Sequence, residues 1–264
     1  MKTAQLWVVL AGIGLAAALF FLRNIPEQTN ALDALLQDRV DSLSSSQATT
    51  WQTLQADWSG DFTDPQLDTL IGFWAAQNEP AVAAALALQR YQSTDSEAHQ
   101  REAAALALET VKTGRQGEAP GVNDNLLFFF TEQAGELYGQ LAAQDSTDLE
   151  ARMGLAATFI DGKGQIMPGV QELLGILKVD SLYVPANLRL GRLSMINGEY
   201  GNVVKRMQKV LQADSTMGEA YVTLASAYRA LGEEAKAQTY LRQSLPHLEE
   251  GPLREEVEKR LKEL

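Results

Sequence analysis

The fold is decided by the stretch AYVTLASAYRALGEEAKAQTYLRQSL, residues Ala220–Leu245. Within it an apolar residue, Leu224, is followed by a small one, Ala225. The apolar side chain can fill the space between two helices, and the small one lets their backbones approach closely. Gly232 follows and can take the positive φ that ends a helix. The stretch therefore predicts two helices joined by a glycine turn.

The same pattern occurs twice upstream, each time 34 residues earlier. Positions of three kinds are in register: an apolar residue, a small residue and a turn glycine. One hairpin of this kind cannot bury its apolar face alone, so neighbouring hairpins must stack. The registered residues are Ala156, Leu190 and Leu224, then Ala157, Gly191 and Ala225, then Gly164, Gly198 and Gly232.

This period and its glycine turn resemble the tetratricopeptide repeat (TPR). The resemblance is strongest in Ala220–Leu245 and also good in Ala186–Ser215. It is weaker in Ala151–Ser181, where the turn is longer and Gly169 replaces the usual alanine. It implies an all-α, right-handed α-solenoid of TPR-like helical hairpins, and a function in holding a protein or peptide.

The composition agrees with an all-α fold, because alanine and leucine dominate and the alternation typical of strands is nearly absent. Divergent helical pairs precede the repeats at Asp64–Tyr91 and Glu97–Gln144. The second pair contains a loop with Gly and Pro at Thr113–Asp124. We expect an anchor at 1–23, a helical spacer at 24–60, divergent TPR-like hairpins at 61–149, three repeats at 150–248 and a capping helix at 249–264.

Three consecutive phenylalanines, Phe128–Phe130, follow this loop. One interpretation is a buried helix face and its neighbours. The alternative is an exposed anchor for a partner.

A transmembrane helix is predicted at the N-terminus. Leu6–Leu22 is uncharged and strongly apolar. At ~1.5 Å per residue it would reach about 26 Å, close to the ~30 Å hydrocarbon core of a bilayer. Trp7 and the pair Phe20-Phe21 fall near its two ends, where aromatic belts lie. We therefore expect membrane attachment through residues 6–22.

The competing interpretation is a cleaved signal peptide with a small-residue site at Ala16–Ala18. The apolar run continues through that site, which favours an uncleaved, single-pass anchor. Lys2 and the α-amino group precede the segment, and Arg23 follows it. The positive-inside bias then places the C-terminal domain outside the cytoplasm, on the periplasmic side of the cell membrane.

The spacer carries an apolar stripe of Leu32, Leu35, Leu36, Val40 and Leu43 on a helix that Asn30 could cap. One interpretation is a short coiled coil that dimerises the protein beside the membrane. The other is a helix that packs on the solenoid. Self-association through this stripe or the solenoid ends would make the protein a structural component of an envelope complex.

The charge excludes several function classes. The formal net charge is −12, whereas phosphate binding needs a basic patch, so we expect no nucleic-acid partner. The chain has no cysteine, and His99 and His247 lie in different helical pairs outside any metal or catalytic motif. We therefore expect no catalytic residue, no metal, no cofactor and no small-molecule substrate, which predicts that the protein is not an enzyme.

As a whole the chain resembles a family of Bacteroidota proteins with an N-terminal membrane segment, a helical spacer and C-terminal TPRs. The resemblance is specific in Met167–Ala237, through the Met-Pro-Gly start, the Asp-Ser joints and the Ile-Asn-Gly-Glu-Tyr turn. The family has no assigned activity, so it implies architecture and little biochemistry.

The first helices of the repeats are expected to line the concave side of the solenoid. Arginines on this side of an acidic protein favour an acidic segment or a C-terminal carboxylate as ligand. Alternatively, they pair with Glu and Asp of the next repeat. The Lys/Asn clamp of chaperone-tail-binding TPRs is absent, since Gly154, Leu188 and Val222 stand in its places. The expected partner-binding residues are Arg152, Thr158, Arg189, Arg192, Met195, Thr223, Ser226 and Arg229.

Overall fold

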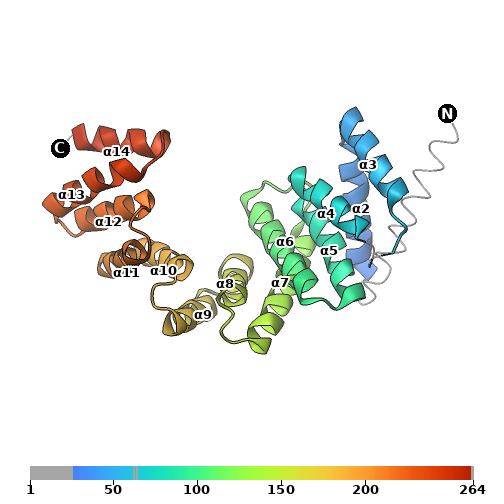
Figure 1. The fold of residues 1–264 in the computed structure, drawn as a ribbon, viewed down its shortest axis with the longest axis horizontal. Coiled ribbons are helices and arrows are strands. Elements are labelled where there is room, and N and C mark those ends of the chain that lie inside the picture. The colour runs from blue at the N-terminus through green and yellow to red at the C-terminus, as the bar shows by residue number, and fades with distance from the viewer. Residues whose placement is uncertain (1–25, 62, 64, 263–264) are drawn as a thin grey trace. The chain divides into compact units, whose positions relative to one another are not determined.

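The computed structural model describes residues 26–61, 63 and 65–262, and every regular element in this part is a helix (Figure 1). The chain divides into two compact units, of which the first ends at Gly169 and the second runs from Val170 to Leu264. None of the described helices is both long and apolar enough to cross a bilayer. The predicted anchor at residues 6–22 lies outside the described residues.

The first unit contains helical pairs and a short π-helix before the start of α9, which spans the division between the units. Its elements are α2 (Pro26–Asp41), α3 (Ser45–Asp57), α4 (Gln66–Ala76), α5 (Pro80–Thr94), α6 (Glu97–Gln116), α7 (Asp124–Gln144), α8 (Leu149–Ala157), the π-helix η1 (Thr158–Gly162) and α9 (Ile166–Val179).

Helix α5 is the centre of the first unit. Pro80 is its first residue, a position that proline favours, and every residue from Pro80 to Arg90 is buried. Its neighbours are α2, α4 and α6. Five alanines among these residues keep the helix narrow, so that other helices can approach it from several sides.

The spacer helix α2 packs onto this core and begins at Pro26, not at Asn30. Leu32 and Leu35 are 2% and 4% exposed, and the rest of the apolar stripe is partly buried against the same cluster. The stripe is therefore used within the chain, and the structure supports the packing interpretation over the coiled coil.

A serine caps the start of α3. The Ser44 hydroxyl accepts a hydrogen bond from the Gln47 N–H at 3.4 Å, and Gln47 Oε1 accepts one from the Ser44 N–H at 2.9 Å. This reciprocal pair is a capping box. It orients α3 so that Trp51 packs edge-on against Trp74 of α4, with ring centroids 5.0 Å apart.

The three phenylalanines Phe128–Phe130 of α7 fit the two interpretations in part. Phe129 and Phe130 are buried, whereas Phe128 is 62% exposed. The loop before them is shorter than predicted, because α6 continues through Thr113 to Gln116. Thr113 is buried and its hydroxyl donates to the Glu109 carbonyl, which holds this turn within the helix.

Close packing explains why residue 169 is a glycine. It is buried at the start of α9, and a Cβ placed on it would lie 2.9 Å from the Ala156 carbonyl oxygen and would overlap the Ile160 side chain. The alanine usual at this place in a TPR would not fit here.

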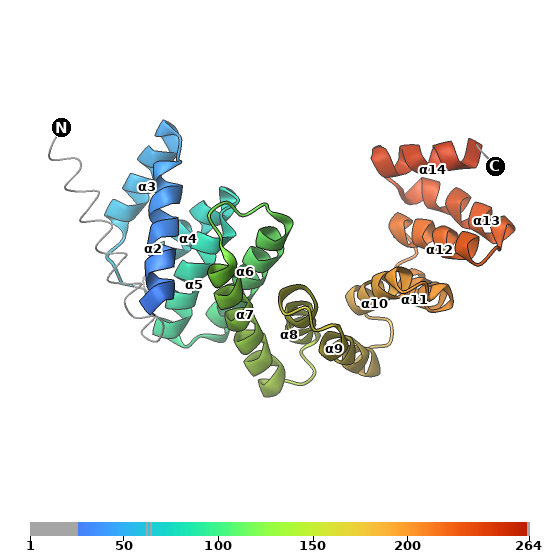
Figure 2. The ribbon, with the colours of Figure 1, turned by 180° about the vertical axis from the view of Figure 1, so that it is seen from behind.

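The second unit consists of two helical hairpins and a terminal helix, seen from two sides in Figures 1 and 2. The turns between the paired helices contain Gly198 and Gly232, with φ of +72° and +77°. Its elements after α9 are α10 (Val184–Ile196), α11 (Tyr200–Ala213), α12 (Gly218–Ala230), α13 (Glu234–Ser244), the 3₁₀-helix η2 (Leu245–His247) and α14 (Pro252–Lys262).

The apolar residues in the 34-residue register lie in the interior of this unit. Leu190 and Leu224 are 7% and 0% exposed, and Met207 of α11 is 1% exposed. A Cβ on Gly191 would lie 2.5 Å from Met207 Cε, so the small residue allows α10 and α11 to approach closely. Helix α14 buries Val257 completely in a cluster with Ala225 and Leu241. It covers the end of the hairpin array, as a capping helix should.

Candidate functional site

The predicted binding residues fall in both units. Arg152 and Thr158 belong to the first unit, and the others belong to α10 and α12 of the second. Thr158 is 1% exposed, and its hydroxyl donates to the Gly154 carbonyl at 2.9 Å. It is therefore a core residue of the first unit and cannot line an open face.

Packing against α7 explains the burial of Thr158. Thr158 stands 34 residues before Arg192 and so occupies the same place in the repeat. However, α7 packs against α8 and η1 here, and a Cβ placed on Gly135 of α7 would lie 3.4 Å from Thr158 Cγ2. The neighbouring helix therefore covers a place that is exposed at Arg192.

Helix α10 presents a mixed apolar and cationic surface. Arg192 is exposed, Met195 one turn later is half-buried, and Ile196 is 80% exposed. Arg192 forms no ion pair within the part of the chain that the structure describes. Arg189, by contrast, is half-buried and has an interaction partner, so it contributes less free charge to this surface.

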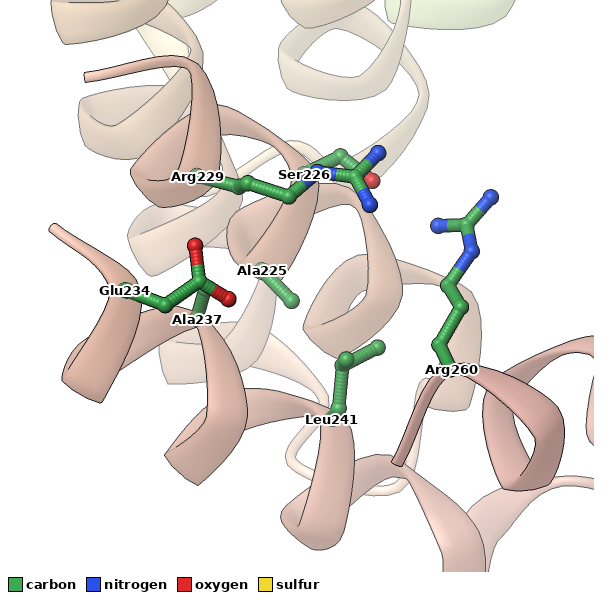
Figure 3. A pocket seen from close by; sticks show the side chains of 7 residues that line it. All are labelled: Ala225, Ser226, Arg229, Glu234, Ala237, Leu241 and Arg260. Carbon is green, nitrogen blue, oxygen red and sulfur yellow. The ribbon is translucent and has the colours of Figure 1, made fainter. Parts of the chain in front are cut away.

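Helix α12 places Ser226 and Arg229 at a pocket of about 190 Å³ in the second unit. Figure 3 shows the Arg229 side chain running past Ser226, with its guanidinium toward the opening. Thr223 lies one turn before Ser226, is half-buried, and donates its hydroxyl to the Glu219 carbonyl. The residues that line the pocket are Ala225, Ser226 and Arg229 of α12, Glu234, Ala237 and Leu241 of α13, and Arg260 of α14.

The charges around this pocket are two arginines and one glutamate. Arg260 Nε lies 2.7 Å from Glu256 Oε1 on the same helix. This hydrogen bond and the charge of Arg260 lower the pKa of Glu256, and the charges of Lys259 and Arg229 add smaller contributions. Arg229 itself has no ion pair among the described residues.

The structure therefore brings together two of the predicted residues, Ser226 and Arg229, and adds Arg260, which sequence reasoning missed. Arg260 stands 34 residues after Ser226, and α14 begins 34 residues after α12, so the capping helix continues the 34-residue spacing. The available signal was this spacing, because it gives Arg260 the same place in α14 that Ser226 has in α12.

Within the described residues, no cluster of three His, Cys, Asp or Glu side chains could hold a metal ion. The pocket contains arginine, serine and apolar side chains and a single carboxylate. Arginine forks recognise carboxylates and other anions, so this pocket is suited to binding an anionic group.

Solved structures with a similar fold define the class of protein. A TPR protein from Parabacteroides merdae superposes with a TM-score of 0.54 at 18% identity, covering 89% of each chain. The MamA protein superposes with a TM-score of 0.50 at 15% identity, covering 70% of this chain and 96% of its own. The fold is therefore that of an α-solenoid of TPR type. No family model matches the sequence, and no curated protein matches it.

Proposed function

We propose that the protein is a membrane-anchored scaffold that binds an acidic segment of a protein partner on the first-helix surface of its second unit. The surface consists of Arg192 and Met195 of α10 and Ser226 and Arg229 of α12. The observation that carries this proposal is a pair of exposed arginines, Arg192 and Arg229, without ion pairs in the described residues of a chain with net charge −12.

The acidic balance of the chain makes this observation informative. With 34 acidic side chains against 22 basic ones, intramolecular partners for an arginine are plentiful. An arginine that stays unpaired is available for a carboxylate of another molecule. Met195 adds a flexible apolar contact beside these charges, of the kind found on surfaces that accept peptides.

Charge reversal tests this surface directly. Full chains carrying Arg192→Glu with Arg229→Glu should lose the partner that the wild type co-purifies from membranes. Both positions are exposed, so the free energy of unfolding should change by less than about 1 kcal/mol.

The matched control is Lys205→Glu with Arg242→Glu, which makes the same charge change at exposed positions of α11 and α13. The control should keep the partner, and wild-type recovery should fall as salt rises, because exposed charges are screened beyond about 8 Å at physiological ionic strength. Equal recovery with all three chains would contradict the proposed surface.

The anchor at residues 6–22 is the second part of the proposal. It is supported by the length and apolarity of Leu6–Leu22. The full chain should remain in the membrane after a carbonate wash, whereas a chain that begins at Arg23 should be soluble. Recovery of a mature protein that begins near Leu19 would show a cleaved signal peptide instead.

The orientation can be tested separately. We propose that the second unit lies outside the cytoplasm, because Lys2 and the α-amino group outweigh Arg23 across the segment. A topology reporter fused after Leu264 should be active outside the cytoplasm. Activity only inside would reverse this orientation.

A further inference from the structure

The second helices of the second unit share an exposed surface without carboxylates. Two places in the 34-residue register make up this surface on α9, α11 and α13, and Lys178 lies one turn further along the same face of α9. Equal places in successive repeats fall on the same side of a stacked array. The outer surface consists of Lys178 together with Gln171, Lys205 and Thr239 at one place and Leu174, Gln208 and Arg242 at the other, and all of these residues are exposed.

Each of the three helices contributes one cation to the outer surface. These cations are Lys178, Lys205 and Arg242. None of them forms an ion pair with another residue that the structure describes. Leu174, which is 41% exposed, adds an apolar side chain, and the other residues of the surface are uncharged. The outer surface is therefore cationic in a chain whose net charge is −12.

The carboxylates nearest to this surface in the sequence are engaged elsewhere. Within the three helices only Glu172 and Glu234 are acidic. Glu172 is half-buried and has an interaction partner, and Glu234 lines the pocket together with residues of α12 and α14. The acidic residues of the flanking turns and joints each have a partner within the chain: Asp180, Glu199, Asp214 and Glu233.

Such a face suits an extended anionic surface better than a single small ligand. Packed helices lie about 8–10 Å apart between their axes, so one small anion cannot contact cations on all three helices. A bilayer with anionic headgroups presents negative charge over a wide area and attracts each lysine or arginine that comes near it. The same headgroups repel carboxylates, and the outer surface has none.

The net charge of the chain does not prevent this contact. At physiological ionic strength, exposed charges more than about 8 Å from the lipid are largely screened. The anchor proposed at residues 6–22 would also hold the folded part of the chain at the membrane, which raises the effective concentration of lipid headgroups around it. Three weakly attracted cations are then sufficient.

We propose that the outer surface, through Lys178, Lys205 and Arg242, docks on the anionic lipid headgroups of the membrane that holds the chain. This contact rests on the anchor proposed above and adds a second attachment to the membrane. It uses the second helices only, so the first-helix surface with Arg192 and Arg229 remains available for the protein partner.

The test uses the full chain in vesicles, either of phosphatidylcholine alone or of equal parts phosphatidylcholine and phosphatidylglycerol. The chain has no cysteine, so Gln208→Cys gives a single site for a bimane label on the outer surface. A trace of lipid with a nitroxide on its headgroup quenches this label on contact. We expect quenching about tenfold greater in the mixed vesicles than in phosphatidylcholine alone. It should be lost at about 1 M salt, where the Debye length is only 3 Å.

Controls locate the contact to the outer surface. Ala230→Cys places the label at the exposed end of α12 and should give little quenching in either kind of vesicle. In the Gln208→Cys chain, Lys205→Gln with Arg242→Gln should reduce quenching about tenfold, because two attractive charges are removed. Lys259→Gln with Lys262→Gln removes two exposed lysines of α14 and is the matched control, which should change quenching less than about twofold.

Two results would overturn the docking surface: equal quenching in the two kinds of vesicle, or undiminished quenching in Lys205→Gln with Arg242→Gln. The proposed function is judged separately. If the chain resists a carbonate wash but its label is not quenched, the anchor stands and the docking surface fails. If the wash releases the chain, the anchor fails and the docking surface fails with it. Arg192→Glu with Arg229→Glu should keep the quenching while it loses the partner, and loss of both would contradict separate surfaces.

Discussion

Both units bring helices together over a buried glycine, but the neighbour differs. In the first unit a Cβ on Gly154 of α8 would enter the ring of Tyr138 on α7. In the second unit a Cβ on Gly191 of α10 would overlap the terminal methyl of Met207, and its other neighbours would lie at ordinary contact distances. The body of the tyrosine ring is rigid and must move as a whole to make room, whereas the end of a methionine side chain can choose another rotamer. The close helix contact at Gly154 therefore tolerates no added side chain atom, whereas the contact at Gly191 can adapt to one.

The two hairpins of the second unit differ in a second way. Tyr221 of α12 and Tyr240 of α13 lie 6.4 Å apart between ring centroids, and Tyr240 stacks on Tyr228 at 5.4 Å. Thirty-four residues earlier the same places hold Asn187 and Arg206, whose side chains share a hydrogen bond of 3.4 Å. Both hairpins share the apolar residues of the 34-residue register. The position between their paired helices holds aromatic side chains in one hairpin and polar side chains in the other.

The largest effect is expected for Gly191→Leu. A large side chain exceeds the space that Met207 can vacate, so α10 and α11 would be forced apart at a cost of roughly 2–4 kcal/mol in unfolding free energy. Gly201→Leu on α11 is the control, because nothing lies within 4 Å of a Cβ placed there. Urea unfolding measures both, and equal stability of the two variants would remove the case for close packing at Gly191.

Substitution of each glycine by alanine compares the two helix contacts. Gly154→Ala should cost roughly 1–3 kcal/mol, since Tyr138 must move. Tyr138 is partly buried, and this burial raises the pKa of its hydroxyl to about 12. Gly191→Ala should cost less than about 0.5 kcal/mol, because Met207 can turn aside and alanine favours the helix. A reversed order in thermal melts would contradict this comparison.

The aromatic and polar versions of the hairpin can be compared by truncation. Tyr240→Ala should cost about 1–2 kcal/mol through the loss of stacking on Tyr228 and Tyr221. Arg206→Ala should cost less than about 0.5 kcal/mol. Burial lowers the pKa of the Arg206 guanidinium, so the charged form is already penalised by folding, and its hydrogen bond to Asn187 is long. Equal losses in urea unfolding would show that the polar pair stabilises as strongly as the stacked rings.

Much of the second unit was predictable from the sequence, and the reasons are local. Within each hairpin, the apolar residue (Leu190 or Leu224) and the turn glycine (Gly198 or Gly232) lie only a few positions apart in the sequence. The prediction at Thr158 was wrong because α7 packs against this residue, a contact that the repeat pattern does not indicate. Arg260 was missed because the 34-residue spacing was not followed into the capping helix, where Arg260 stands 34 residues after Ser226.

The first unit was less predictable because its core depends on which helix lies in the middle. The run of alanines and leucines in Pro80–Arg90 indicates a helix, but an amphipathic reading assigns it one buried face. The structure buries it on every side, since α2, α4 and α6 surround it. Which helices meet is a property of the whole packing and not of any short stretch.

The smallest effect on stability is expected for Thr216→Val, in the joint between α11 and α12. The Thr216 hydroxyl and N–H donate to Asp214 Oδ1 at 2.6 and 2.9 Å, and the hydroxyl is the larger cause of the lowered pKa of Asp214. A lowered pKa stabilises the fold above the ordinary carboxyl range, and this contribution is lost as pH falls through the folded-state pKa. Thr216→Val should raise the pKa of Asp214 toward its ordinary value, as measured by carboxyl ¹³C NMR titration.

The first unit supplies the control for this joint. Thr147 donates in the same way to Asp145, and Thr147→Val should raise the pKa of Asp145 and leave that of Asp214 unchanged. An unaltered titration of Asp214 in Thr216→Val would show that the backbone N–H alone sets its pKa.

The most direct test of the account is site-specific photo-crosslinking of the full chain in cells, with a photoreactive residue at Met195 on the proposed surface. The comparison position is Thr239, which is exposed on α13 and outside that surface. The account predicts a discrete protein adduct from Met195 that disappears when Arg192 and Arg229 are both changed to Glu, and no such adduct from Thr239. An adduct from Thr239 but not from Met195, or one from Met195 that persists in the double variant, would contradict binding at the arginine surface.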